Sequence, residues 1–371
     1  MKRTLILSFL LLFLPSMNKG ELLAGNRKYS QQARNVIKLL RRASRTSPYF
    51  GHQDALMYGQ NWWHKESDTL YTKSDIYDVC GKYPYLLGLD LGRIELEGDK
   101  NIDGCLFRQM KEAAIKHYER GGFVTISWHM NNPVTGGTTW DCSAGNVIRE
   151  ILSDSLLHQK YLHWLDVGAD FINHIVDKKG RKIPVLFRPF HECNMEGFWW
   201  SGKSCTADEY IALWKLTFDY FMQEKRMYQL LWVYSPHDIK SEEELGMRYP
   251  GDEYVDVIGY ERYQLGSITY EAGAERFAKG VSKGIDMTLA FAKPRNKVVA
   301  FTETGFPGIP YEKWWTEALG CGIKDKSIAY VLLWRNAKSE NYYFGPCKKS
   351  GSSPNFIHLV KKQKIKLLSP R

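Results

Sequence analysis

Cysteine is sparse in this 371-residue chain and is absent from the first 79 residues. No thiol is therefore available near the N-terminus for the lipid anchor of a bacterial lipoprotein. The seven cysteines include no Cys-x-x-Cys pair, so a zinc-binding motif is not indicated. Because seven is an odd number, at least one thiol stays free unless it bridges to another chain.

Long apolar runs are also missing after the N-terminal segment, so no membrane-spanning helix is expected. The N-terminal segment has Lys2 and Arg3 followed by an apolar run over residues 5–14, which is too short to cross a bilayer of about 30 Å. We interpret residues 1–20 as a signal peptide that is cleaved near Gly20. We therefore expect an exported protein, either periplasmic or secreted.

Three further absences limit the possible functions. The net charge is +10, but its basic clusters are short, such as residues 361–364, so nucleic-acid binding is not expected. No Gly-x-Gly-x-x-Gly motif follows a predicted strand, which argues against a dinucleotide site. No low-complexity linker divides the chain, so we expect residues 21–371 to form a single domain. We also expect the protein to be a monomer.

Short apolar runs alternate with longer helical patterns along the chain. The predicted strands cover residues 47–52, 84–90, 122–129, 184–191, 229–235, 254–260, 298–303 and 328–334. The predicted helices include residues 106–120, 146–178, 206–226, 268–292 and 311–319, with Thr206 as an N-cap. This alternation predicts an α/β fold, a single-domain (β/α)8 TIM barrel. The alternative, an open doubly wound sheet, would require the missing glycine-rich turn.

The active site of such a barrel lies at the carboxyl ends of its strands. Glu192 lies at the end of the fourth predicted strand, and Glu303 ends the seventh. Retaining glycosidases use two carboxyls about 5–5.5 Å apart, so we predict these two glutamates as the catalytic pair. Arg188, four residues before Glu192, is expected on the same strand face. His191 and Tyr263 are candidate hydrogen-bond donors to a carboxylate.

Aromatic residues are abundant, with 12 Trp, 22 Tyr and 17 Phe, and flat apolar rings with a polar edge suit sugar binding. Adjacent tryptophans on an extended segment cannot both face a ligand, so at least one member of such a pair is expected to pack in the interior. The candidate sugar platforms are Trp128, Trp140, Trp199, Trp200 and Trp334.

Histidines offer an alternative interpretation of the same strand ends as a metal site. The residues concerned are His129 and His191, together with His52, His64 and His237. No His-x-His pair ends the first predicted strand, so we expect no catalytic metal.

The motifs at the strand ends resemble those of glycoside hydrolase family 26, whose best-known members are β-mannanases. The matching segments extend over almost the whole chain after residue 20. They include Gly51-His52-Gln53, Gly88-Leu89-Asp90, Ser127-Trp128-His129, Arg188-Pro189-Phe190-His191-Glu192 with Phe198-Trp199-Trp200, Phe301-Thr302-Glu303-Thr304-Gly305 and Trp334-Arg335-Asn336.

The resemblance implies a (β/α)8 barrel that works by retaining double displacement without a cofactor. It implies that Glu192 is the acid/base and Glu303 the nucleophile. It further implies that this pair is held by Arg188, His191 and Tyr263, and that sugar is contacted by His129 and Trp334. Two positions depart from the family pattern: Gly197 replaces a usual tryptophan, and Glu261 replaces a usual aspartate.

We therefore predict hydrolysis of β-1,4-mannosidic bonds, with mannan, glucomannan, galactomannan or manno-oligosaccharides as the binding partner. One alternative is a related β-glycanase that acts on mixed-linkage β-glucan or β-1,3-xylan. Another is a catalytically inactive glycan-binding protein. The loops over residues 53–73 and 130–146 follow the first and third strands, and their lengths could close one end of the groove. The sequence therefore leaves two modes open, endo cleavage and exo cleavage with release of mannobiose.

Overall fold

The computed structural model describes residues 28–266, 269–337 and 342–370. The predicted signal peptide over residues 1–20 lies outside the described residues. Among the helices of the described residues, none is long and apolar enough to cross a membrane. All seven cysteines lie in the described part of the chain, and each is free.

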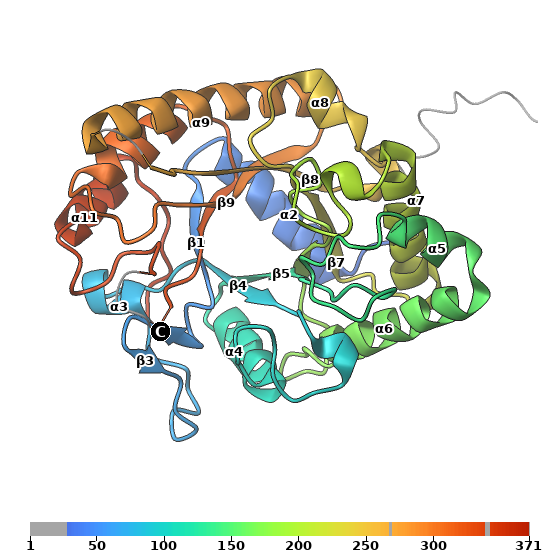
Figure 1. Ribbon diagram of the computed structural model, residues 1–371. Coiled ribbons are helices and arrows are strands. Elements are labelled where there is room, and N and C mark those ends of the chain that lie inside the picture. The colour runs from blue at the N-terminus through green and yellow to red at the C-terminus, as the bar shows by residue number, and fades with distance from the viewer. Residues whose placement is uncertain (1–27, 267–268, 338–341, 371) are drawn as a thin grey trace, which may run out of the picture.

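Eight parallel strands close into a barrel, which confirms the predicted (β/α)8 fold (Figure 1). Around the barrel the order is β1-β10-β9-β8-β7-β6-β5-β4, and β4 pairs with β1 to close it. The strands are β1 (Tyr49–Gln53), β4 (Leu86–Asp90), β5 (Phe123–Ser127), β6 (Val185–Arg188), β7 (Leu230–Tyr234), β8 (Val257–Tyr263), β9 (Val298–Gly305) and β10 (Tyr330–Leu333). Nearly all their residues are buried, because helices cover the outside and side chains fill the inside.

Helices surround the barrel (Figure 1). They are α2 (Gln31–Ser44), α3 (Asp75–Cys80), α4 (Phe107–Glu119), α5 (Val147–Ser153), α6 (Ser155–Asn173), α7 (Ala207–Asp219), α8 (Glu242–Met247), α9 (Tyr270–Ala292), α10 (Cys321–Ile323) and α11 (Ser353–Lys362). The 3₁₀ and π turns are η1 (Ile94–Leu96), η2 (Gly202–Ser204), η3 (Tyr220–Glu224), η4 (Asp252–Tyr254) and η5 (Trp315–Gly320). A hairpin of β2 (Tyr58–Gly59) and β3 (Trp62–Trp63) lies in the loop after β1.

Helix α2 precedes the first barrel strand and is absent from the predicted elements. Its N-cap is Ser30, whose hydroxyl accepts a hydrogen bond from the backbone of Ala33. Its buried residues share an apolar cluster with the first residues of several strands, among them Tyr49, Leu86, Phe123, Val257, Val298 and Tyr330. Helix α2 therefore covers the amino ends of the strands and leaves the carboxyl ends for the site.

Three predicted helices differ in detail from the structure. The helix predicted over residues 311–319 is replaced by the π turn η5, which begins at Trp315. The helix predicted over residues 146–178 is two helices, because Asp154 ends α5 and then caps α6 by accepting a hydrogen bond from the backbone of Leu157. The N-cap predicted at Thr206 is confirmed. Its hydroxyl and the carboxylate of Glu209 form a reciprocal capping box, and α7 continues through the π turn η3.

The fourth barrel strand is shorter than predicted and ends at Arg188. Pro189 lacks a backbone donor, and Phe190 and Glu192 have left-handed φ angles of 48° and 53°, so extended pairing cannot continue. The expectation that Arg188 and Glu192 share one strand face is therefore wrong. Arg188 ends the strand, and Glu192 lies on a turn beyond it.

Candidate active site

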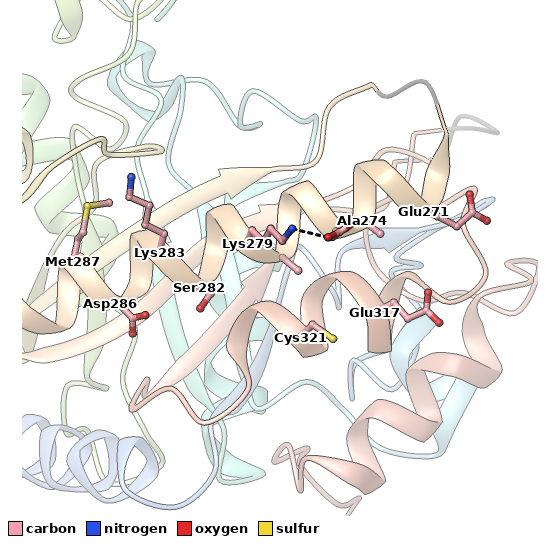
Figure 2. Close-up of a pocket in the computed structure, with 11 residues that line it drawn as sticks. Glu271, Ala274, Lys279, Ser282, Lys283, Asp286, Met287, Glu317 and Cys321 are labelled. Carbon is pink, nitrogen blue, oxygen red and sulfur yellow. Dashed lines mark hydrogen bonds and ion pairs between the residues drawn. The ribbon is translucent and has the colours of Figure 1, made fainter.

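Hollows lie both on the outside of the barrel and at the carboxyl ends of its strands. A groove of about 680 Å³ lies on the outside of the barrel, between α9 and the η5–α10 segment. Figure 2 shows the side chains that line it. Its polar lining includes the exposed ion pair of Lys279 with Glu275, at 2.6 Å. A smaller pocket of about 310 Å³ lies at the carboxyl ends of the strands, where barrel enzymes place their catalytic groups. The smaller pocket is the candidate site because both predicted catalytic glutamates line it.

The pocket is lined by acidic, imidazole, aromatic and a few aliphatic side chains. They are Ile102, Asp103, His129, Trp140, Glu192, Met195, His237, Tyr263, Leu265, Glu303, Trp334, Arg335 and Tyr342.

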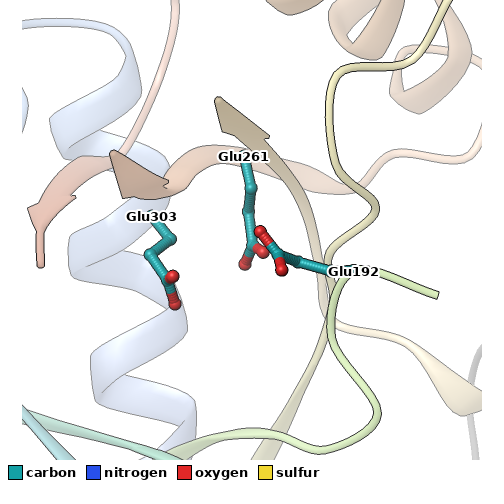
Figure 3. Close-up of side chains that lie close together, drawn as sticks. All are labelled: Glu192, Glu261 and Glu303. Atoms are coloured by element: carbon teal, nitrogen blue, oxygen red, sulfur yellow. The ribbon is translucent and has the colours of Figure 1, made fainter. Parts of the chain in front are cut away.

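Three carboxylates converge in the mouth of the barrel (Figure 3). Glu192 follows β6, whereas Glu261 lies on β8 and Glu303 on β9. One oxygen of each lies within 4.8 Å of an oxygen of the other two. This closeness fits the spacing of about 5–5.5 Å in retaining glycosidases better than the 6.5–9.5 Å of inverting ones. Glu192 and Glu303 are 8% and 4% exposed and line the pocket, whereas Glu261 is fully buried.

The backbone around Glu192 is fixed from several directions. Its amide donates to the carbonyl of Ser235 at 2.8 Å, and its carbonyl accepts from the amide of Met195 at 2.9 Å. The indole of Trp200 donates to the carbonyl of His191 at 2.9 Å. These contacts hold the left-handed turn at Glu192, so its side chain is directed into the pocket from a rigid support.

Arg188 connects the other two carboxylates. Its guanidinium forms buried ion pairs with both Glu261 and Glu303. The hydroxyl of Tyr263 donates to the second oxygen of Glu303 at 2.7 Å, which confirms the predicted contact of this tyrosine with a carboxylate. Glu303 is thereby held at both oxygens, one by a cation and one by a phenol. A carboxylate held in this way keeps a fixed orientation toward the pocket.

Burial and nearby charges shift the pKa values of Glu261 and Glu303. Burial raises the pKa of Glu261 well above its usual value, and the nearby charges of Glu303 and Glu192 add to this rise against the effect of Arg188. Burial also raises the pKa of Glu303, but Arg188 and Tyr263 oppose that rise. The Arg188 guanidinium and the Tyr263 hydroxyl thus favour the charged form of Glu303, which is the form that a nucleophile requires.

Glu192 has a partner that the sequence interpretation missed. The Nδ1 atom of His237 lies 2.7 Å from Oε1 of Glu192. In the described residues the ring of His191 forms no hydrogen bond to either catalytic glutamate, so the expected contact from His191 is absent. Burial, with Arg188, instead lowers the pKa of His191 well below its usual value, which keeps the ring neutral. His237 lies in the loop after β7, and the sequence linked it only to a possible metal site.

His129 and two tryptophans surround one side of the pocket. Nδ1 of His129 lies 2.7 Å from Asp90, which also accepts from Ser127 at 2.6 Å. Burial lowers the pKa of His129, but the charge and hydrogen bond of Asp90, together with the charges of Glu303 and Asp103, outweigh this effect, and the net shift is upward. The rings of Trp334 and Trp140 lie 6.1 and 5.9 Å from the imidazole. The structure thus brings His129, Trp140 and Trp334 together at the pocket.

Three of the predicted sugar platforms lie in the interior. Trp128, Trp199 and Trp200 are 2%, 0% and 0% exposed, so none can stack on a sugar, and the prediction of sugar contact is wrong for them. Their indole nitrogens donate at 2.9 Å to protein oxygens of Glu95, Met130 and His191, respectively. These tryptophans pack beneath the site and support the loops that form it.

Asp103 and Arg335 line the pocket but are not among the predicted site residues. They form an ion pair at 3.2 Å on the side where the loops after β4 and β10 meet. Arg335 follows Trp334 in the Trp334-Arg335-Asn336 motif, and its place next to a predicted site residue could have indicated it. Asp103 lies in an irregular loop, and no pattern in the sequence marks it.

The three carboxylates are close enough to share a cation. The Arg188 guanidinium already supplies positive charge to two of them, and Glu192 pairs with His237. Each of the three carboxylates therefore already has a protein partner.

A closed parallel barrel with two carboxylates this close at its mouth is the arrangement of a (β/α)8 glycosidase. The model of glycosyl hydrolase family 26 matches residues 26–292, and the chain belongs to this family. The family resemblance seen in the sequence motifs is thus confirmed.

Solved and curated proteins agree with this membership. A family 26 β-mannanase from Bacteroides ovatus is 34% identical, with a TM-score of 0.86 over 92% of this chain and 96% of that one. A mannan endo-1,4-β-mannosidase of Bifidobacterium adolescentis is 31% identical over 71% of this chain but 28% of its own length. One from Bacillus subtilis is 30% identical over 62% of this chain and 60% of its own. The chain thus spans less than two thirds of these two curated relatives.

Proposed function

We propose that the chain hydrolyses β-1,4-mannosidic bonds in mannan, glucomannan or galactomannan, with retention of configuration. The observation that carries the proposal is the close pair of Glu192 and Glu303 in a family 26 barrel. The names of the relatives favour mannan and internal cleavage over mixed-linkage β-glucan or β-1,3-xylan. The intact carboxylate pair favours an enzyme over an inactive glycan-binding protein.

In the first step a carboxylate oxygen of Glu303 attacks the anomeric carbon, and the bond to the leaving oxygen breaks. Glu192 gives its proton to that oxygen. In the second step Glu192 takes a proton from water, the water oxygen attacks the anomeric carbon, and the ester bond to Glu303 breaks. Both glutamates return to their starting states. Arg188 and Tyr263 hold Glu303 in line throughout.

The pocket walls offer the groups that a sugar requires. The rings of Trp334 and Trp140 are candidate stacking faces, and His129 is a hydrogen-bonding group beside them. Asp103 and Arg335 add polar groups for hydroxyls farther along the pocket.

The test is release of reducing sugar from mannan, barley glucan and β-1,3-xylan. We expect release from mannan and little from the other two, and binding without release from any of them would overturn the proposal. Glu303→Ala and Glu192→Ala should each abolish most hydrolysis of mannan. The matched control is Glu196→Ala, because Glu196 is an exposed glutamate four residues after Glu192 that pairs with Lys203. Long oligosaccharides early in the reaction would support internal cleavage.

Azide gives an independent test of the role of Glu192. With an activated aryl β-mannoside, azide should restore turnover in Glu192→Ala and yield a β-glycosyl azide, because azide attacks without help from a base. An azide product of inverted configuration would contradict the retaining mechanism.

We also propose that residues 1–20 direct export, that residues 21–371 form the catalytic domain, and that the protein acts as a monomer. N-terminal sequencing of the exported protein and its mass in solution test these points. An intact N-terminus on exported protein, or a stable dimer, would contradict them.

A further inference from the structure

His237 lies outside the family motifs of this chain, yet it contacts a predicted catalytic glutamate. Its Nδ1 atom lies 2.7 Å from Oε1 of Glu192, and both side chains are largely buried, at 18% and 11% exposed. Among the described residues, this is the one hydrogen bond from a protein side chain to the Glu192 carboxylate. Glu303, in contrast, is held by both Arg188 and Tyr263. The orientation of Glu192 therefore depends on His237.

The backbone of His237 is fixed on two sides. Asn194 accepts a hydrogen bond from its amide at 2.8 Å and donates one to its carbonyl at 2.6 Å. Asn194 also donates to Glu244 at 2.8 Å, which ties the pair to α8. On the other side, His237 forms a parallel bridge with Glu261 of β8. Because Asn194 is only two residues beyond Glu192, the donor and its acceptor belong to one rigid unit.

The chemistry of Glu192 gives this contact a direction. A carboxylate can only accept, so the Nδ1–H of His237 donates to Glu192 whenever that residue has lost its proton. A hydrogen bond to a charged group is stronger than one to a neutral group. The contact with His237 therefore strengthens while Glu192 passes its proton to the leaving oxygen. An interaction that strengthens during a step lowers the barrier of that step more than it changes substrate binding.

We infer that His237 is a positioning residue that aims the carboxyl of Glu192 and stabilises its negative charge as the proton leaves. The inference rests on the proposed role of Glu192 as the acid/base. It predicts that His237 matters when the leaving group needs a proton and matters little when it does not.

The test compares His237→Asn with His237→Leu. These two side chains have the same shape, but only asparagine places an N–H donor near the position of Nδ1. His237→Phe is a second variant that keeps a ring without a donor. Lys240→Ala is the matched control in the same loop, because that lysine is exposed and pairs with Asp238. The substrates are a manno-oligosaccharide, which needs acid assistance, and 2,4-dinitrophenyl β-mannobioside, which does not.

We expect His237→Leu to lower kcat/KM on the manno-oligosaccharide by about 10- to 100-fold, the range for a lost hydrogen bond to a charged group. On the dinitrophenyl substrate the loss should be within about threefold, because no proton is needed for that leaving group. Asparagine should recover most of the loss, and the KM for the manno-oligosaccharide should change little. Glu192→Ala should show the same dependence on the leaving group, with a larger loss.

Several results would overturn the inference. Equal losses on the two substrates would indicate a general structural defect, and a change confined to KM would indicate direct sugar binding. Leucine and asparagine variants with equal activity would show that the donor is irrelevant. An inactive but folded wild-type protein on both substrates would instead overturn the proposed function. If His237→Leu is unfolded by circular dichroism, His237→Phe replaces it in the comparison with asparagine.

Discussion

Arg188 is the buried cation on which the carboxylate cluster depends, so its removal has a calculable cost. Its side chain is 1% exposed and pairs with Glu261 and Glu303, whose side chains are 0% and 6% exposed. The substitution Arg188→Met keeps much of the side-chain volume and removes the charge. It leaves two buried carboxyls without their cation.

The magnitude follows from what remains unpaired. Removing one partner of a buried ion pair typically costs about 3–5 kcal/mol, because the other charge stays buried without compensation. Two hydrogen bonds to charged groups, at about 1.5–3 kcal/mol each, give a similar total. We therefore expect Arg188→Met to lower the free energy of unfolding by about 3–5 kcal/mol near neutral pH, in addition to abolishing activity.

The cost should depend on pH in a defined direction. Burial already raises the pKa of Glu261 and of Glu303 above their usual values, and Arg188 opposes both shifts. Without the guanidinium both values rise further. The folded state then binds more protons than the unfolded state above about pH 4.5, so its stability falls as the pH increases. The cost of Arg188→Met should be smaller near pH 5 than near pH 8.

Denaturant unfolding at the two pH values measures both quantities. Arg262→Met is the matched control, because Arg262 also pairs with an acid, Asp238, but in a partly exposed position. That ion pair should contribute about 0–1 kcal/mol. A cost for Arg188→Met below about 1 kcal/mol, or one that does not grow with pH, would show that the buried carboxyls do not depend on the Arg188 charge.

Other substitutions test separate parts of the structure. Glu261→Gln should change the free energy of unfolding by less than about 1 kcal/mol, because burial raises the pKa of Glu261 and the amide oxygen of glutamine can still accept from Arg188. A loss above about 3 kcal/mol in urea would contradict this. Because Asp90 raises the pKa of His129 above 6.5, their pairing stabilises the fold below that value and is lost as the pH rises through the raised pKa. Asp90→Asn should therefore cost more stability near pH 5.5 than near pH 9, and a cost independent of pH would count against the pairing. Trp199→Ala should lose about 3–5 kcal/mol of stability in thermal melts, because Trp199 is buried. Trp334→Ala should fold normally and raise the KM for mannan, because Trp334 lines the pocket. The reverse pattern would show that the buried and the pocket tryptophan are misassigned.

The barrel was predictable because its strands are short apolar runs that recur between helical patterns. The same regularity located Glu192 and Glu303, since each lies near the carboxyl end of a strand. Helix α2 is a counterexample, because it lies before the first strand and repeats no part of the pattern. Its role is evident only from its apolar contacts with the first residues of the strands.

The partners of the catalytic glutamates could not be predicted in the same way. His237 reaches Glu192 across 45 residues of sequence, from a loop whose path depends on Asn194 and on β8. Arg188 lies near Glu192 in the sequence but pairs with Glu261 and Glu303. Such contacts depend on how the chain turns after a strand ends, and the alternation of apolar and polar residues carries no information about those turns.

The excess of aromatic residues has a structural cause that the sequence could not separate from sugar binding. Left-handed φ angles at Phe190 and Glu192 cost about 1–3 kcal/mol each, and the surrounding structure must offset this strain. Trp200 donates to the carbonyl of His191, and the hydroxyl of Tyr210 donates to that of Phe190. The ring of Phe190 also packs edge-on against those of Trp200 and Tyr210. Buried aromatic side chains therefore stabilise the strained turn that aims the acid/base, and only the rings that line the pocket are available to a sugar.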